Sequence, residues 1–153
     1  MTLLILSDSH GSTVFLEQAL KRERGADIIV HLGDGADDLD MLREFTGGRL
    51  VYQCNGNMDI YRCDYSERCI FPAENVTVFA CHGHRYDVKS GLYRLSLAAR
   101  EQNARICLFG HTHSQFADDT DGLLLLNPGS IRKGDYAVVT VTDENVSYKL
   151  KQI

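Results

Sequence analysis

The sequence lacks an apolar run long enough to cross a membrane, and it has no excess of basic residues. The apolar run at residues 3–6 stops at Ser7 and Asp8, and no basic residue precedes it, so we expect neither a leader peptide nor a membrane anchor. A net charge of -5 gives no support for a nucleic-acid footprint. These absences predict a soluble cytoplasmic protein, and they disfavour membrane and nucleic-acid partners.

The cysteines form no C-x-x-C pair, and their number is odd. They are Cys54, Cys63, Cys69, Cys81 and Cys107. This pattern argues against both a disulfide framework and a thiolate zinc site. Cys81 and Cys107 lie within apolar runs, where cysteine behaves as a small hydrophobic residue. We expect the thiols to be reduced.

The chain also lacks repeats, low-complexity tracts and linkers, which predicts one domain over residues 1–153. Apolar runs typical of strands cover residues 3–6, 28–30, 50–52, 76–80, 106–109, 123–126, 137–141 and 146–150. Helical spacing occurs at residues 15–20, 39–45 and 92–99, with Ser12 as the first expected N-cap. The first half thus alternates strand and helix.

Turn signals in the second half, at residues 121–122 and 143–145, predict antiparallel hairpins between neighbouring strands. Alternating strands and helices followed by hairpins indicate an α/β architecture. We expect two packed sheets flanked by helices.

Five polar clusters follow strand-like runs in a fixed order. They are Asp8-Ser9-His10, Gly33-Asp34, Gly56-Asn57, His82-Gly83-His84 and Gly110-His111-Thr112-His113. Residues two apart in extended backbone project to the same side, so Asp8 and His10 could bind one cation, as could His111 and His113. The glycines permit backbone turns that a residue with a Cβ would find strained. We therefore expect a metal site at the C-terminal ends of the strands.

Any one of these clusters alone is better explained as an ordinary turn. Together they bring seven oxygen or imidazole ligands to strand ends, which exceeds the need of one tetrahedral ion and suits two ions with a shared carboxylate. Paired divalent ions are well suited to phosphoester hydrolysis. The seven predicted ligands are Asp8, His10, Asp34, Asn57, His82, His111 and His113.

The order D-x-H, G-D, G-N-x-D, H-G-H and G-H-x-H resembles the calcineurin-like metallophosphoesterases. The short length and the sequence Asn127-Pro128-Gly129-Ser130 resemble the small YfcE/MJ0936-type phosphodiesterase branch of that superfamily. This resemblance implies a four-layer αββα sandwich of two mixed β-sheets. It also implies a phosphodiesterase in which a metal-bridging hydroxide attacks the phosphoester bond of a small substrate.

The resemblance further implies how the ligands divide between the two ions. One ion would be held by Asp8, His10 and His113, the other by Asn57, His82 and His111, with Asp34 bridging. Relatives use manganese, iron, zinc or nickel, and the donor set does not choose among them, although we name Mn²⁺ first. Small relatives often form dimers or larger assemblies, so a homo-oligomer stays open.

Met58 departs from the family pattern, since many relatives have at this position a histidine that protonates the leaving oxygen. A thioether cannot donate a proton. General acid assistance is worth about 10²- to 10⁴-fold, so we expect a preference for acidic leaving groups such as aryl oxygens. His84 could reach the substrate phosphate or donate a proton instead. The predicted catalytic residues are therefore Asp8, His10, Asp34, Asn57, His82 and His84.

Three further polar residues have weaker assignments. Asp59 serves either a local turn or the orientation of a metal-binding histidine. His31 is expected to be a packed strand-end residue, and Arg132 is a weak candidate for binding a substrate anion.

Two other functions are compatible with the same fold. It serves as a protein-binding scaffold in the retromer subunit that resembles this branch, where the metal site is degraded. The intact ligand set here favours an enzyme, while Met58 favours the scaffold. A nuclease is disfavoured, because no basic groove is readable from the sequence.

Overall fold

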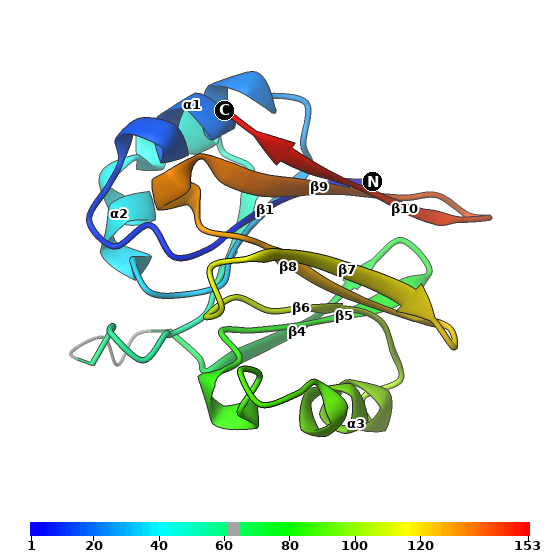
Figure 1. Ribbon diagram of the computed structural model, residues 1–153. Helices are drawn as coiled ribbons and strands as arrows, with labels where there is room; N and C mark the ends of the chain where they lie inside the picture. Colours follow the sequence, from blue (N-terminus) through cyan, green and yellow to red (C-terminus); the bar gives the residue numbers. More distant parts are fainter. Residues whose placement is uncertain (61–64) are drawn as a thin grey trace.

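Two five-stranded mixed sheets packed face to face form the centre of the protein (Figure 1). The computed structural model describes residues 1–60 and 65–153. The strands are β1 Thr2–Leu6, β2 Ile28–His31, β3 Leu50–Gln53, β4 Arg68–Ala73, β5 Val76–Cys81, β6 Ala104–Leu108, β7 Gln115–Thr120, β8 Leu123–Pro128, β9 Asp135–Val141 and β10 Val146–Gln152. The helices are α1 Val14–Arg22, α2 Ala36–Met41 and α3 Tyr93–Glu101, with 3-10 turns η1 Arg43–Thr46, η2 His84–Tyr86 and η3 Ile131–Lys133.

The parallel strands of each sheet determine where the loops meet. The first sheet has the order β10-β9-β1-β2-β3, in which β1, β2 and β3 are parallel. The second has the order β4-β5-β6-β8-β7, in which β5, β6 and β8 are parallel. Since parallel strands end at the same edge of a sheet, the loops that follow them converge there.

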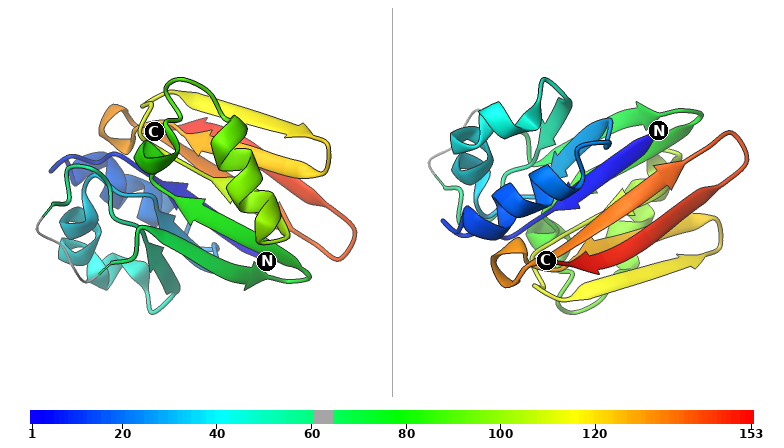
Figure 2. Two further views of the ribbon diagram at one scale, coloured as in Figure 1. Left: turned by 90° about the horizontal axis from the view of Figure 1, so that it is seen from below. Right: turned by 90° about the horizontal axis from the view of Figure 1, so that it is seen from above.

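Alternation along the strands produces the layers. In β1, Leu3 and Ile5 face the core between the two sheets, while Leu4 and Leu6 pack under α1 and α2. Successive side chains of a strand point to opposite faces, so one apolar run supplies both cores. Helices α1 and α2 cover the outer face of the first sheet, and α3 covers the second (Figures 1 and 2). The expected four-layer sandwich is confirmed.

Two strands, β4 and β7, were missing from the sequence prediction. Both are edge strands. In β4 the apolar residues 69–71 are followed at once by Pro72, and β7 carries Asp118 and Asp119, so neither shows a long apolar run. Charged residues and proline are typical of sheet edges, where they block pairing with other chains.

The missing β7 also changes the hairpin at residues 121–122. That turn joins β7 to β8 in an antiparallel pair, whereas β6 and β8, the neighbouring strands of the sequence prediction, run parallel. The turn at residues 143–145 joins β9 to β10 antiparallel, as expected.

The helix ends differ from the expected ones in detail. Helix α1 begins after Thr13 rather than Ser12, and no side chain caps its first turn. The second helical segment divides at Leu42 into α2 and η1. Of the cysteines, Cys63 lies outside the described residues, and the other four are free thiols. In the described part of the chain no helix has the length and apolarity needed to cross a bilayer.

Candidate metal centre

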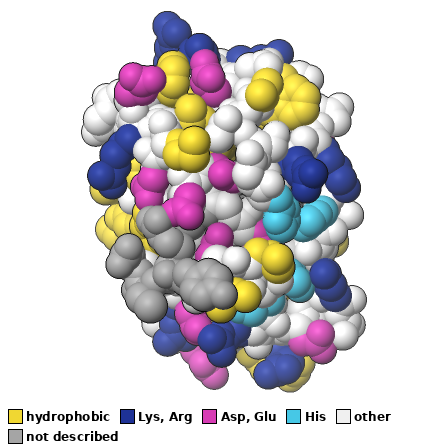
Figure 3. Space-filling model, turned by 90° about the vertical axis from the view of Figure 1, so that its left-hand side faces the viewer, with side chains coloured by type: hydrophobic (Ala, Val, Ile, Leu, Met, Phe, Trp, Pro, Cys, Tyr) yellow, Lys and Arg dark blue, Asp and Glu magenta, His cyan; other side chains and the backbone are white. Residues whose placement is uncertain are grey.

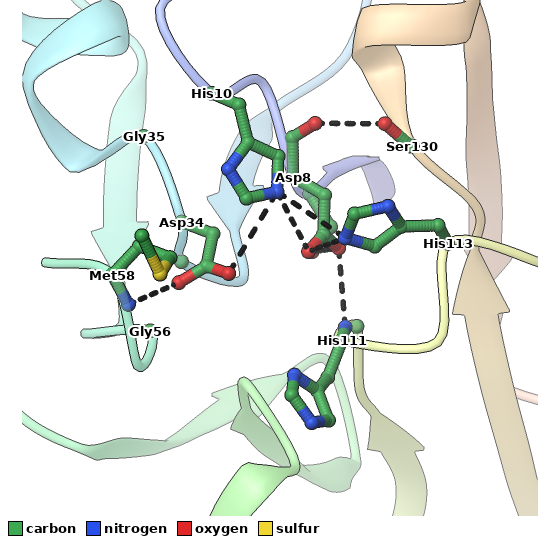
Figure 4. A network of polar contacts seen from close by, with 12 residues as sticks. Asp8, His10, Asp34, Gly35, Gly56, Met58, His111, His113 and Ser130 are labelled. Atoms are coloured by element: carbon green, nitrogen blue, oxygen red, sulfur yellow. Dashed lines mark hydrogen bonds and ion pairs between the residues drawn. The ribbon is translucent and has the colours of Figure 1, made fainter. Parts of the chain in front are cut away.

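Seven predicted ligands come together where five strands end. Asp8 and His10 follow β1, Asp34 follows β2, and Asn57 follows β3. The second sheet contributes His82 after β5, and His111 and His113 after β6. Figure 4 shows the side chains of Asp8, His10, Asp34 and His113 converging from these separate loops. The histidines also form a visible group on this face of the molecule (Figure 3).

The backbone that carries these side chains is strained. Nine non-glycine residues in the described ranges have positive φ, and five of them are predicted ligands. Their φ angles are 58° for Asp8, 47° for His10, 55° for Asp34, 68° for His111 and 55° for His113. Such left-handed conformations are uncommon without glycine and gather at functional sites. The tight turns bring the side chains of three polar clusters into one space.

The ligand atoms form two groups that share Asp34. In the first, His113 Nε2 lies 3.0 Å from Asp8 Oδ1, and His10 Nε2 lies 3.7 Å from Asp34 Oδ2. In the second, His82 Nε2 lies 3.3 Å from Asp34 Oδ2. Asp34 Oδ2 therefore faces both groups.

Two more contacts complete the second group. His111 Nδ1 lies 3.2 Å from His82 Nε2, and Asn57 Oδ1 lies 3.2 Å from the same nitrogen. Ligand atoms bound about 2.1 Å from one ion are about 3.0–3.4 Å apart at ordinary coordination angles. These separations fit a shared cation.

A buried oxygen without a hydrogen bond gives a further test of the fit. Asp8 Oδ1 is buried and accepts no hydrogen bond from the residues that the structure describes. Its other oxygen, Oδ2, accepts from Ser7 Oγ at 2.5 Å and from the His111 N–H at 3.1 Å. A buried carboxylate oxygen without a hydrogen bond is costly unless a cation compensates it. The nitrogen and oxygen donors, without thiolate, fit divalent metal ions.

Asp34, like Asp8, has one carboxylate oxygen that accepts a hydrogen bond from a backbone N–H. Its Oδ1 accepts from the Met58 N–H at 2.8 Å, which leaves Oδ2 toward the histidines. The carboxylate of Asp59 in turn accepts from the N–H groups of Asp34, Gly35 and Gly56 at 2.7, 2.9 and 2.8 Å. Of the two roles open to Asp59, these contacts support the local one, in which it joins the loops after β2 and β3.

The glycine next to Asn57 allows those two loops to touch. A Cβ on Gly56 would lie 2.1 Å from Asp34 Oδ1, and one on Gly33 would lie 2.5 Å from the Gly56 nitrogen. A side chain at Gly56 would move the shared carboxylate, and one at Gly33 would move the backbone of Gly56. Both glycines therefore let backbone come close to the site.

The ring of His82 is fixed by its second nitrogen. Its Nδ1–H donates to the Leu32 carbonyl at 2.9 Å, so Nε2 faces Asp34 and Asn57. Burial opposes the charged form of His82, but the hydrogen bond to Asp34 and the charge of Asp8 raise its pKa. Burial opposes the charged form of Asp34 as well and would raise its pKa. Its contacts with His82 and the Met58 N–H nevertheless lower that pKa to about 2.

His84 lies beside the two groups rather than within them. Its ring centroid is 5.4 Å from that of His82 and 6.2 Å from that of His111. Burial and the charges of His82 and Arg85 lower the pKa of His84, which favours the neutral form of the ring. Burial and the charges of His82 and Lys89 lower the pKa of His111 to about 4.

A buried hydrogen-bond network, which the sequence analysis did not predict, holds the loop that carries Asp8 and His10. His31 Nδ1 accepts from the Gly33 N–H, so its Nε2–H donates to Ser9 Oγ at 3.2 Å, and Ser9 donates to Asp38 Oδ2 at 2.6 Å. Asp38 also accepts from the Gly11 N–H at 2.8 Å. His31 is fully buried, as expected of a packed strand-end residue. Burial of Ser9 and Asp38 has no signal in the sequence.

The Asn-Pro-Gly-Ser sequence supports the site from the other side. Asn127 Nδ2 donates to the Gly110 carbonyl at 2.8 Å, and Ser130 Oγ donates to the Asp8 carbonyl at 2.8 Å. It thus connects the loops after β6 and β1. Arg132, on the exposed 3-10 turn that follows, stays a prediction.

Comparison with known proteins agrees with this geometry. The family model for the calcineurin-like phosphoesterase superfamily domain matches residues 1–144. The chain belongs to the calcineurin-like phosphoesterase superfamily. It is 30% identical over 151 residues to the probable metallophosphoesterase YsnB of Bacillus subtilis, covering 94% of this chain and 86% of that protein. It is 26% identical over 150 residues to the phosphodiesterase MJ0936 of Methanocaldococcus jannaschii, covering 84% and 83%.

Solved structures of the superfamily share the fold. A predicted phosphoesterase from Streptococcus pneumoniae superposes with a TM-score of 0.83 at 30% identity, covering 99% of this chain and 88% of that one. Vps29 from Entamoeba histolytica, solved with zinc, superposes with a TM-score of 0.79 at 21% identity, covering 100% and 98%. The second similarity is one of fold alone.

Gly56→Ala should weaken metal binding by about 10- to 100-fold, because the added Cβ displaces the Asp34 carboxylate. Isothermal titration of Mn²⁺ into the metal-free protein measures the change. Gly25→Ala is the matched control, since nothing lies within 4 Å of a Cβ there. Equal affinities of the two variants would contradict the close approach of these loops.

His31 should make stability depend on pH. Burial lowers its pKa below the usual value of about 6.5, so the unfolded chain binds the proton more tightly. Its contribution is complete above about pH 6.5 and is lost as the pH falls toward the folded pKa. Between about pH 7.5 and 5.5, the metal-free wild type should lose about 1 kcal/mol more free energy of unfolding than His31→Gln. Urea denaturation at both pH values tests this, and parallel losses would refute it.

Proposed function

We propose that this protein is a phosphodiesterase that depends on two divalent metal ions. The sharing of Asp34 between the two ligand groups carries the proposal. One ion would be held by Asp8, His10 and His113, and the other by Asn57, His82 and His111. Membership of the phosphoesterase superfamily supports hydrolysis of a phosphoester, and the similarity to a named phosphodiesterase supports a diester.

When bound, two such ions would activate the attacking water and neutralise the charge that develops on the phosphoryl oxygens. The protein's own contribution is to fix the ligands before substrate arrives. Asp8 and Asp34 each have one oxygen held by N–H or O–H donors, and the other oxygen is left for a cation. Preorganised charge of this kind lowers the cost of rearrangement during the reaction. Mn²⁺ is the first candidate, with iron, zinc or nickel as alternatives.

We further propose that His84 binds the substrate phosphate. It lines a cavity of about 460 Å³ together with Asn57. A neutral imidazole donates one hydrogen bond, which a phosphoryl oxygen would accept. Met58 contributes its backbone N–H to Asp34, while its side chain is 62% exposed and offers no proton.

A protein-binding scaffold is the second candidate, favoured by Met58 and by the fold shared with Vps29. The complete set of ligand side chains supports the enzyme instead. A cytoplasmic location is part of the proposal, because free thiols persist in reducing compartments.

Hydrolysis of bis-p-nitrophenyl phosphate with added Mn²⁺ tests the proposal. Asp34→Asn should reduce kcat/KM by at least about 100-fold, since it weakens the shared ligand of both groups. The exposed Asp143→Asn is the control and should keep wild-type activity. Absence of turnover by the wild type with manganese, iron, zinc and nickel would favour the scaffold.

The leaving group gives a second test. Without a proton donor at Met58, an aryl diester should be hydrolysed at least about 100-fold faster than an alkyl phosphomonoester. Met58→His should narrow that difference, because an imidazole restores a donor beside the ligands. Equal rates of the wild type on both substrates would contradict the role assigned to this position.

A further inference from the structure

A groove leads away from the second ligand group along the loop after β5. It consists of two adjoining cavities of about 460 and 540 Å³ that share Glu67, His84 and Arg85 as lining residues. Asn57 lines the cavity next to the ligands, and Tyr86 lines the other. We call this feature the Arg85 groove. Cavities of this size accommodate small organic ligands, so the groove has room for much more than the reacting phosphate.

The backbone around Arg85 holds the groove in shape. The chain turns sharply before η2, where Gly83 has a φ of 106°. A Cβ on Gly83 would lie 3.0 Å from the Val88 side chain, so the turn also packs closely against that residue. The ring of Tyr86 packs edge-on against Phe79 with centroids 6.0 Å apart. One wall of the groove is therefore a fixed aromatic ring, and aromatic rings provide a face on which bases or aryl groups stack.

The charges of the groove differ from those of the whole protein. The chain carries a net charge of -5, so an anionic substrate needs local cations to bind. Arg85 forms an ion pair with Glu67, and the side chains are 63% and 55% exposed. Exposed ion pairs contribute little, so Arg85 can exchange Glu67 for the anion of a ligand. Arg68 also lines the groove.

We propose that Arg85 determines specificity by binding a second anionic group of the substrate. The substrate class is a small phosphodiester in which one ester arm carries both an aromatic ring and a further phosphate or carboxylate. Asn57 lies at the end of the groove that receives the reacting phosphate. His84 and Arg85 lie where the two cavities adjoin, and there Arg85 binds the second anion, while Tyr86 lies along the ring in the outer cavity. This inference rests on the proposed phosphodiesterase function.

Two chromogenic substrates that differ only in the second anion provide the test. They are thymidine 5′-(p-nitrophenyl phosphate) and its 3′-phosphorylated form, assayed with Mn²⁺ at low ionic strength. The wild type should have about five- to tenfold higher kcat/KM for the 3′-phosphorylated form, mainly through KM, because a guanidinium forms charge-assisted hydrogen bonds with phosphate. In Arg85→Gln this ratio should fall to about one.

Matched variants separate the role of Arg85 from general effects of charge. Arg85→Lys should keep part of the preference, and Glu67→Gln should raise it by removing the competing carboxylate. Arg24→Gln, near the end of α1, should keep the wild-type ratio. Turnover without a preference, or the same preference in Arg85→Gln, would overturn this inference alone. No turnover of either substrate with any of the four metals would overturn the phosphodiesterase function and the inference with it.

Discussion

The burial of two carboxylates, Asp8 and Asp34, is the constraint on which the rest of the structure depends. In each, one oxygen is bound by donors from neighbouring loops and the other is left toward histidine nitrogens. A buried carboxylate in this state is unfavourable without a cation. The arrangement therefore makes sense as half of a metal centre, and the surrounding loops exist to hold it.

Holding it requires strain that only the packed sheets can offset. Five predicted ligands have left-handed backbone, and glycines at residues 33 and 56 let two loops touch. Of the strands below them, β1 and β2 are almost entirely buried, with apolar residues on both faces. A rigid double-sheet core supplies the stability that strained loops need. The hydrogen bonds of Asp59, Asp38 and Asn127 then connect those loops to one another.

The surroundings of the centre define what it can act on. Met58 provides a backbone N–H and no side-chain proton, so the proposed chemistry depends on a good leaving group or on another donor. The groove lined by His84 and Arg85 gives the substrate somewhere to extend. The leaving group and the contacts beyond the phosphate together define a narrower substrate class than membership of the superfamily does.

The sequence by itself determined the strand-helix order of the first half, the four-layer class and the seven residues that meet. Apolar runs and glycine-flanked polar clusters are local patterns, and parallel strands bring their ends to one edge whatever the detailed packing. Only the tertiary structure revealed β4 and β7, since proline follows the short apolar stretch of β4 and adjacent aspartates leave β7 without an apolar run. It alone also decided that Asp59 binds backbone amides, that Ser9, His31 and Asp38 form a buried network, and that Arg85 borders a groove. Those features depend on which polar side chains become buried together, and burial is a property of the packed chain rather than of any segment of it.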